Sequence, residues 1–389
     1  MDSLEKNIRY FTRESHILAS LSVSFGTLGE SHTHRDGYAR EGVPVTEHTI
    51  YDLASVSKLF LCVALMQLQE AGRLHLSDPV RKYAPQFLYL DGITLHDLMA
   101  FQVCLTTPVR IDRCESREEA LSALFGCRPS PISGVRVYSD IPAMVLKYAV
   151  ESAADTDLFS LIRSQILRPL GMEHTYAKVP DLSLCADYSG ERRLENGRFT
   201  VRTGPAPGTP HDPKAAALSP FGDDLCGHAG LFSTEGDMIR FCRGLLSGAL
   251  LSPASLREIS VNRTGCVLGD GRIRQHLGYL CYLKHPNQYD SEIPAYMGHS
   301  AFGIGGFTGN HLSVDPEKGI FALFLGNRCR SRLTVLLPEA GKSRTDYGLA
   351  ENGEGIYSGV YSSVDWVHRK DALLHDPIAK WFSHDSSRA

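Results

Sequence analysis

Ser55 and Lys58 have the spacing in this 389-residue chain that most directly indicates chemistry. They lie in the stretch 51–60, which we expect to form the first turn of a long apolar helix ending near Gly72. Residues three apart share one helix face, so the lysine amine can reach the serine hydroxyl. A desolvated amine there lowers the barrier to removing the hydroxyl proton, which makes the serine a nucleophile. Because Ser3 and Lys6 show the same spacing, the prediction needs support from other residues.

A third group must handle protons, because both serine attack and leaving-group release require proton transfer. Tyr138 is the best candidate, since it lies in a loop just before a helix and has apolar neighbours. A phenol near a buried lysine can have its pKa lowered and act as a base. In the alternative interpretation Tyr138 is a core aromatic residue and Asp140 is only the N-cap of the next helix.

The stretch 298–310 is rich in glycine and comes just before a predicted hairpin. Glycines beside a strand let a ligand approach backbone N–H groups, as an oxyanion hole requires. The alternative is a glycine-rich strand end that serves packing only. Gly298-His299-Ser300 matches half of a G-x-S-x-G elbow, but Phe302 occupies the last glycine position, which argues against an α/β-hydrolase.

His228 lies in a second tight turn, 227–234, that leads into a helix. It can line a pocket, although a lone histidine is more often structural. His32 and His34 are two apart on a polar loop, and the sequence has neither an H-E-x-x-H motif nor a phosphate-binding loop. We therefore expect no metal and no other cofactor.

Composition describes an ordinary globular protein, with 43% hydrophobic and 22% charged residues. A formal net charge of -4 and a pI near 6.5 give no indication of a basic surface that would bind nucleic acid or anionic lipid. We expect no signal peptide, because residues 1–6 do not form a basic segment followed by an apolar run. No apolar run approaches a membrane span, and the ten cysteines contain no C-x-x-C pair. We expect a cytoplasmic protein with reduced thiols and a small-molecule partner.

Alternating Ala19, Leu21, Val23 and Phe25 predict a half-buried strand that follows an amphipathic helix over residues 1–15. Three later strands, near 279–284, 311–314 and 320–325, can form an antiparallel meander that pairs with it. We expect an α/β (α+β) fold, an antiparallel sheet flanked by helices. Its sheet subdomain comprises residues 1–75 and 226–389, and an inserted, mainly helical subdomain spans 76–225 with a long surface loop over 181–225.

Three motifs in order resemble those of the serine β-lactamase and penicillin-binding-protein superfamily, in its class C-like branch. They are Leu53–Lys58, the Y-S-D run Tyr138–Asp140 and Gly227–Thr234, and the pair His211-Asp212 stands where many members carry a similar pair. The likeness runs from about residue 16 to 330. It implies a β-lactamase/transpeptidase-like fold and the activities of that branch, which include D,D-peptidases, β-lactamases and family VIII carboxylesterases.

The resemblance implies a role for each residue. Ser55 would be acylated, and Lys58 would accept or relay its proton. Tyr138 would help deprotonate Ser55 and pass a proton to the leaving group, while Asp140 would position Lys58 or the substrate. The oxyanion hole would combine the N–H of Ser55 with one on the strand of the third motif.

The third motif departs from the usual pattern. The favoured register sets Gly303–Asn310 on G-H-T-G-F-T-G-T, so that Ile304 replaces the ionisable residue and Phe307 N–H becomes the oxyanion donor. The rival register keeps a cation by using His299, but needs a five-residue insertion before the hairpin. In the favoured register we still expect His299 to contribute from upstream. The residues expected to bind substrate are Asp140, His228, His299, Gly305, Gly306 and Phe307.

Loss of the cationic group would weaken binding of a substrate carboxylate, which penicillins and peptide C-termini both present. A reshaped segment at 100–105, where relatives often carry H-T-S-G-L, points the same way. We therefore expect a serine esterase or amidase rather than a D,D-carboxypeptidase or β-lactamase, acting on a small ester, amide or β-lactam. The alternatives are an acyltransferase with the same Ser-Lys-Tyr site and a non-catalytic penicillin-binding or sensor-like pseudoenzyme.

Overall fold

The structure is a computed structural model that describes residues 2–195, 198–201, 204–219, 224–330, 333–337, 356–357, 360–361 and 366–384. The strands are β1 (Ser20–Thr27), β2 (Ser31–Arg40), β3 (Val43–Pro44), β4 (Tyr51–Asp52), β5 (Cys104–Thr106), β6 (Arg128–Ser130), β7 (Arg192–Glu195), β8 (Arg198–Val201), β9 (Phe232–Ser233), β10 (Tyr282–Leu283), β11 (Phe302–Gly305), β12 (His311–Asp315), β13 (Ile320–Gly326), β14 (Leu333–Leu337), β15 (Ile356–Tyr357) and β16 (Val360–Tyr361). The helices are α1 (Asp2–Arg9), α2 (Ser57–Glu70), α3 (Val80–Tyr83), α4 (Leu95–Met99), α5 (Arg117–Phe125), α6 (Ile141–Ala154), α7 (Leu158–Ile162), α8 (Pro213–Leu218), α9 (Glu235–Leu246), α10 (Pro253–Ile259), α11 (Trp366–Lys370) and α12 (Asp376–His384).

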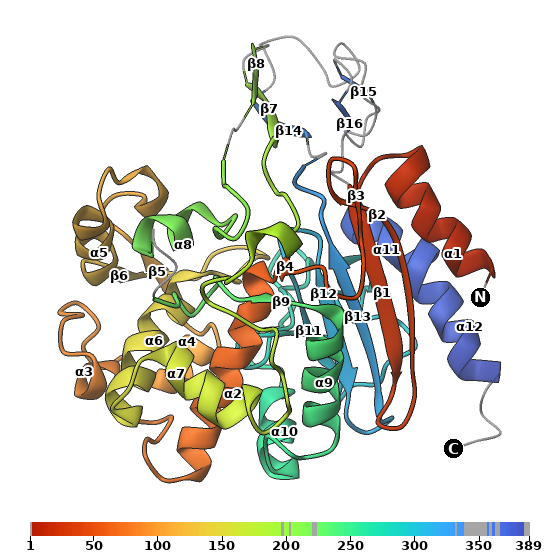
Figure 1. Cartoon of the computed structure of the whole chain (residues 1–389). Coiled ribbons are helices and arrows are strands. Elements are labelled where there is room, and N and C mark those ends of the chain that lie inside the picture. The colour runs from red at the N-terminus through yellow and green to blue at the C-terminus, as the bar shows by residue number, and fades with distance from the viewer. Residues whose placement is uncertain are drawn as a thin grey trace.

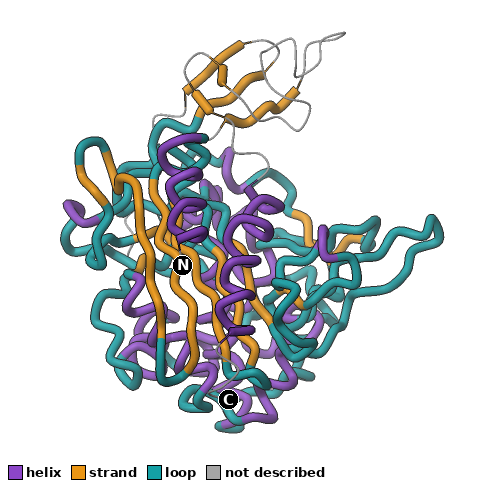
Figure 2. The backbone as a smooth tube through the Cα atoms, turned by 90° about the vertical axis from the view of Figure 1, so that its right-hand side faces the viewer, coloured by secondary structure: helices purple, strands orange, loops and turns teal. Residues whose placement is uncertain are grey.

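Seven strands form one sheet in the order β10-β11-β12-β13-β1-β2-β3, and every neighbouring pair in it is antiparallel. Four late strands, β10 to β13, join the N-terminal strand through the pairing of β13 with β1, in the register Leu21 with Gly326 to Thr27 with Ile320. The fourth, β11, comes from the glycine-rich stretch and lies between two of the three predicted strands. This confirms the predicted antiparallel sheet flanked by helices. Helices α1, α11 and α12 cover one face, as Figures 1 and 2 show, while α2, α9 and the other helices lie on the opposite face.

The outer face of the sheet is covered by both ends of the chain. Leu4, Ile8 and Phe11 are buried against it, as the amphipathic pattern of residues 1–15 predicts. Trp366 packs on Phe11, with ring centroids 5.0 Å apart. The N-terminal and C-terminal helical segments therefore share one hydrophobic layer, and α1 and α12 lie on the same side of the molecule in Figure 1.

Strand β1 is buried on both faces, so the prediction that it is half-buried is wrong. Its serines lie beneath α9 and β2 rather than in water. Ser22 donates to the Glu235 carboxylate, and Ser24 Oγ lies 2.9 Å from Thr33 Oγ1. The alternation of apolar residues and serines therefore reflects two covered faces, and the hydroxyls of Ser22 and Ser24 find hydrogen-bond partners inside the protein.

The segment between β4 and β9 is mainly helical, and α2 packs against α6 and α7 at its centre. One predicted helix over 94–105 is shorter than expected: α4 ends at Met99, Phe101 adopts a φ of 53°, and the chain continues as β5. Residues 181–225 also contain more order than predicted, because β7 and β8 pair with each other and β7 pairs with β14. These strands extend from the body at the top of Figure 1.

None of the described helices is long and apolar enough to cross a membrane. All ten cysteines lie in the described part of the chain, and none of them forms a disulfide. The division into subdomains at residues 75 and 225 stays a prediction.

A buried histidine pair lies where the C-terminal segment meets the sheet. His311 on β12 and His375 pack with ring centroids 4.8 Å apart, and each has one ring nitrogen without a hydrogen-bond partner. His311 Nε2 lies 3.1 Å from Ser313 Oγ, and His375 Nδ1 lies 3.3 Å from Tyr296 Oη. Burial, followed by the neighbouring cations, lowers the pKa of both histidines well below 6.5.

This pair predicts a loss of stability in mild acid. The unfolded chain takes up protons near pH 6.5 whereas the folded chain does not, so the stabilisation present above pH 6.5 is lost as pH falls, by about 1.4 kcal/mol per pH unit for each histidine. Urea unfolding at pH 7.5 and 5.5 measures this, and His375→Gln should show a shallower decline than the wild-type protein. Identical declines would contradict the assignment. The comparison of variants is needed because buried Asp52, whose pKa is raised to about 6, increases the stability of the fold as pH falls and so opposes the effect of the histidines.

Candidate active site

Ser55 is presented by a strained turn. It lies in the 3-10 turn Ala54–Val56 between β4 and α2, so the α-helix begins two residues later than predicted. Ala54 has a φ of 47°, a left-handed conformation that costs a residue with a Cβ atom about 1–2 kcal/mol. Within residues 51–60, Ser55 alone is half-buried and the others are buried. The sharp turn therefore exposes one hydroxyl at the edge of a packed core.

Asp52 fastens that turn to two distant segments. Its carboxylate accepts hydrogen bonds from the N–H groups of Ala54 at 2.8 Å and His211 at 2.7 Å. Its carbonyl accepts from Thr308 Oγ1 at 2.9 Å and Asn310 Nδ2 at 2.8 Å. Burial raises the pKa of Asp52 to about 6, although the two N–H donors oppose the shift. Asp52, two residues before the nucleophile turn, thus fixes the positions of the other walls of the site.

Lys58 is fully buried beside Ser55. Its ammonium nitrogen lies 3.0 Å from Ser55 Oγ, 2.7 Å from Asp140 Oδ1 and 3.1 Å from the His228 carbonyl oxygen. An ammonium group has three N–H donors, and here each has an acceptor. Lys58 in this arrangement can stabilise a Ser55 alkoxide, and it can accept the serine proton only after giving up one of its own.

Tyr138 lies over the lysine, with Lys58 Nζ 5.0 Å from the ring centroid. Its hydroxyl is buried and makes no hydrogen bond of normal geometry within the described residues. Burial, and then the charge of Asp140, raise the pKa of Tyr138 well above 10, and the nearby Ser55 hydroxyl opposes this only in part. The expectation of a lowered pKa is therefore wrong, because removal of the phenol from water is the largest influence on it. A protonated phenol is suited to donate a proton, as to a leaving group.

Two aromatic rings fix the orientation of Tyr138. Tyr282 of β10 stacks on it with centroids 5.1 Å apart, and Phe101 packs on it at 5.4 Å. The side-chain oxygen of Gln275 accepts from its backbone N–H at 3.1 Å. The interpretation of Tyr138 as an aromatic packed among core residues thus holds for the ring, while its hydroxyl lies in the site.

Asp140 forms ion pairs with two lysines, which the interpretation of this residue as only a helix cap did not predict. It is the N-cap residue of α6 by backbone position, but its side chain makes no cap hydrogen bond. Its two oxygens bind two lysines instead, Lys58 at 2.7 Å and Lys214 at 3.0 Å. Burial raises the pKa of Asp140, but these two cations and His228 outweigh it and hold the pKa below its ordinary value.

Lys214 and Asp212 extend this network to His228. Lys214 Nζ lies 3.3 Å from Asp212 Oδ2, and Asp212 Oδ1 lies 3.0 Å from His228 Nε2. Asp212 is also the N-cap of α8, where it accepts the N–H of Lys214 and of Ala215. The imidazole ring of His228 therefore belongs to an ionic network, while the backbone carbonyl of the same residue contacts Lys58. Lys214 was not foreseen, because nothing in the sequence distinguishes it from a surface lysine at a helix start.

A glycine lets the His228 loop approach α6. Gly227 has a φ of 79°, and a Cβ atom there would lie 2.6 Å from the Ala143 carbonyl oxygen. Only glycine fits this combination of conformation and contact. The close approach delivers the His228 carbonyl to Lys58.

The glycine-rich strand β11 ends beside the nucleophile turn. A Cβ atom at Gly306 would lie 2.9 Å from the Leu53 carbonyl oxygen, so glycine allows the strand end to touch the nucleophile turn. Gly306 N–H donates to Asn310 on the β12 side, and backbone groups of alternate residues point to opposite edges of a strand. Those of Gly305 therefore face the other edge. Phe307 follows, with its ring stacked on His211 at 5.5 Å. The oxyanion role of Phe307 N–H stays a prediction.

His299 is not brought to Ser55. It is exposed, and its neighbours Gly298 and Ser300 both bind the Asp315 carboxylate, at 2.6 and 2.9 Å. Asp315 ends β12 at the far end of the β11-β12 pair, whereas Gly305 pairs with His311 at the near end. The expectation that His299 contributes from upstream is thus wrong. Ile304, in the favoured register, is fully buried in the hydrophobic core.

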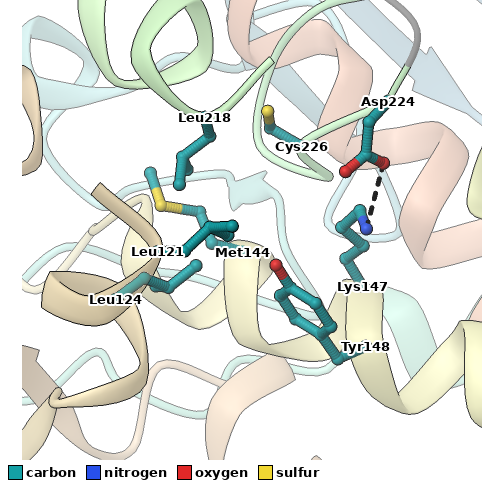
Figure 3. Close-up of a pocket in the computed structure, with 8 residues that line it drawn as sticks. All are labelled: Leu121, Leu124, Met144, Lys147, Tyr148, Leu218, Asp224 and Cys226. Atoms are coloured by element: carbon teal, nitrogen blue, oxygen red, sulfur yellow. Dashed lines mark ion pairs between the residues drawn. The ribbon is translucent and has the colours of Figure 1, made fainter. Parts of the chain in front are cut away.

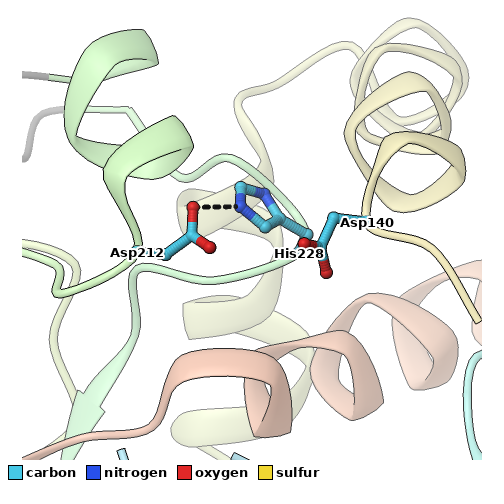
Figure 4. A group of neighbouring side chains, drawn as sticks. All are labelled: Asp140, Asp212 and His228. Carbon is cyan, nitrogen blue, oxygen red and sulfur yellow. Dashed lines mark hydrogen bonds and ion pairs between the residues drawn. The ribbon is translucent and has the colours of Figure 1, made fainter. Parts of the chain in front are cut away.

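Asp140, Asp212 and His228 have ligand atoms within 4.8 Å of one another, as metal ligands would (Figure 4). Their partners argue for a different role. Both carboxylates are ion-paired to Lys214, and Asp140 is also ion-paired to Lys58. Two ammonium groups compensate the negative charge and would repel a divalent cation. The cluster therefore orients Lys58 rather than providing a vacant metal site.

A small pocket lies on the other side of the His228 loop (Figure 3). Its apolar floor comes from α5, α6 and α8, and Lys147 closes it by pairing with Asp224 at 3.0 Å. The Cys226 thiol faces it, and burial raises the pKa of that thiol above its ordinary value. Ser55, Lys58 and Tyr138 do not line this pocket. Its residues therefore pack beneath the His228 loop and do not form part of the active site.

Residues 12–339 match the Beta-lactamase family, a region that includes Ser55, Lys58, Tyr138 and β11. The chain belongs to the beta-lactamase family. A protein of Escherichia coli K12 named "Putative D-alanyl-D-alanine carboxypeptidase" is 29% identical over 320 residues, covering 74% of this chain and 71% of that protein. Its namesake from Salmonella typhi is 26% identical over 317 residues, covering 74% and 72%.

Two solved structures share the fold of this family member. One is the octameric penicillin-binding protein homologue from Pyrococcus abyssi, with a TM-score of 0.60 at 20% identity, over 84% of this chain and 73% of that one. The other is simvastatin synthase from Aspergillus terreus, with a TM-score of 0.62 at 18% identity, over 84% and 91%. These likenesses confirm the predicted β-lactamase/transpeptidase-like architecture. Family membership makes the chain a serine hydrolase or transpeptidase-like enzyme.

Removing the buried amine should abolish acylation. Lys58→Met should lower the rate of fluorophosphonate labelling of Ser55 by roughly 10³-fold, within the 10²–10⁴ range of proton-transfer groups. Asp140 keeps Lys214 as a partner, so the fold should survive. The matched control is Lys147→Met, which removes another buried, ion-paired lysine away from Ser55. Labelling of the Lys58 variant at a rate near that of the control would show that Lys58 is structural.

Tyr138→Phe should matter most for poor leaving groups. Because its raised pKa keeps the phenol protonated, its loss should slow hydrolysis of an alkyl ester by roughly 10²-fold and that of a p-nitrophenyl ester far less. Steady-state kcat/KM on the two esters measures the difference. Tyr282→Phe, which removes the hydroxyl of the stacked neighbour, is the control. Equal losses on both esters would contradict a proton-donor role.

Proposed function

We propose that this protein is a serine esterase or amidase that cleaves its substrate through an acyl-enzyme on Ser55. The observation that carries the proposal is the contact between the half-buried Ser55 hydroxyl and the fully buried Lys58 ammonium at 3.0 Å. Such a contact favours the alkoxide in a site from which water is partly excluded. Tyr138 then supplies the proton that the leaving group needs.

Strand β11, which carries the third motif, supports esterase or amidase activity over D,D-carboxypeptidase or β-lactamase activity. Ile304 is buried in the core, and His299 lies at the far end of β11. Within the described residues, neither places a cation at the near end of this strand to bind a substrate carboxylate. Lys58 and Lys214 are both occupied by aspartates. A substrate without a carboxylate beside the scissile bond therefore suits the site best.

A substrate panel tests the proposal. We expect turnover of short neutral p-nitrophenyl esters at a kcat/KM at least tenfold above that of nitrocefin or a D-Ala-D-Ala peptide, since a carboxylate bound without a cation forfeits an interaction of about 1.5–3 kcal/mol. Ser55→Ala should abolish turnover. Ser57→Ala is the control, because Ser57 is buried and its hydroxyl accepts the Leu231 N–H.

Two results would contradict the proposal. Equal ester hydrolysis by the wild-type protein and Ser55→Ala would remove Ser55 from the chemistry. A preference for the D-Ala-D-Ala peptide would restore the carboxypeptidase assignment.

A further inference from the structure

Glu292 places a carboxylate against the strand that faces the substrate. A Cβ atom at Gly305 would lie 3.3 Å from Glu292 Oε2, so the carboxylate covers the bare face of that glycine. Strand β10 pairs with β11 only at Phe302 and Gly303. Beyond Gly303 the same edge of β11 is unpaired in the sheet. A group bound along this edge, over Gly305, would therefore meet Glu292.

The carboxylate, rather than its partner, faces outward. Glu292 Oε2 lies 3.4 Å from Lys370 Nζ, and the lysine side chain is 2% exposed whereas that of Glu292 is 20% exposed. The same ammonium also lies 3.8 Å from Asp371 Oδ1. One buried cation thus lies near two carboxylates, and Glu292 is the more exposed partner of its pair with Lys370.

Glu292 also acts on the proton-transfer end of the site. Tyr282 pairs with Gly303 and stacks on Tyr138, which links the neighbourhood of Glu292 to the catalytic phenol. After burial itself, the charge of Glu292 is among the causes that raise the pKa of Tyr138 and of Tyr282. The carboxylate is therefore within electrostatic reach of the groups around Ser55.

We propose that Glu292 binds a positively charged group of the substrate, so that the preferred esters or amides carry an amine or quaternary ammonium in the part that lies over Gly305. This inference rests on the proposed function and names its substrate class. The charged side chain that lies against Gly305 is an anion, and the ammonium groups of Lys58 and Lys214 beside Ser55 are paired with aspartates. Charge complementarity both attracts the cationic substrate and repels the anionic one.

Two matched series of esters test the proposal, because the charge can lie in either half of the substrate. The acyl series comprises p-nitrophenyl esters of butanoate, 4-(trimethylammonio)butanoate and glutarate. The leaving-group series comprises S-acetyl esters of 2-methoxyethanethiol, thiocholine and 3-mercaptopropanoate. In at least one series the ratio of kcat/KM for the cationic ester to that for the anionic ester should exceed one in the wild-type protein. Glu292→Gln should lower it on the order of tenfold, as expected for one unit charge near a protein surface.

Glu151→Gln is the matched control. Glu151 is also 20% exposed and also pairs with a buried lysine, Lys147, at 2.8 Å, but lies about three turns along α6 from Asp140. It should leave both ratios unchanged. A Glu292→Gln protein whose ratios match the wild-type values in both series would overturn the proposal, and so would one that loses stability and slows on all esters alike. That last outcome would show that Glu292 only docks the C-terminal segment.

The outcomes also separate this inference from the function on which it rests. If no ester in either series is turned over, or if Ser55→Ala hydrolyses them equally, the proposed function fails and this inference with it. If Ser55-dependent hydrolysis is present but its charge preference does not depend on Glu292, only this inference fails.

Discussion

The burial of the Lys58 ammonium is the constraint on which the rest of the site depends. An ammonium without water costs several kcal/mol unless every N–H is paired, and removal of a partner from a buried ion pair typically costs about 3–5 kcal/mol. The protein meets this requirement with Ser55 Oγ, the Asp140 carboxylate and the His228 carbonyl. Three separate segments must therefore converge on one nitrogen, and their convergence assembles the reactive geometry.

Each of those segments is held in place by its own set of local contacts. The strained Ala54 turn is fixed by Asp52, and the His228 loop approaches α6 through Gly227. Asp140 is shared with Lys214, which Asp212 and His228 anchor in turn. Because Asp52 also binds the segment after β11, the nucleophile turn and the glycine strand are fixed relative to each other. The geometry around Ser55 is thus determined by hydrogen bonds between distant parts of the chain.

Charge distinguishes the two sides of this site. Around Lys58 the carboxylates and ammonium groups compensate each other, which suits a nucleophile that must become an alkoxide. Along β11, Glu292 lies against Gly305 and is paired with the buried Lys370. The catalytic groups are those of a family with many activities, whereas the charges along the strand bear on which substrate is bound.

The sequence by itself determined the antiparallel sheet with its flanking helices and the pairing of Ser55 with Lys58, because local spacing and apolar periodicity encode them. Its three motifs carried the resemblance to the family. It also placed Tyr138 and Asp140 near a helix start. It did not determine the direction of the Tyr138 pKa shift, the burial of β1 on both faces or the distance of His299 from Ser55. Each of these depends on which distant segments cover a residue. Lys214 and Glu292 became visible only when the fold brought residues far apart in the chain within about 3–4 Å of Asp140 and Gly305. Only the tertiary structure decides such contacts, since the free energy of a buried charge is set by its neighbours in space and not by its neighbours in sequence.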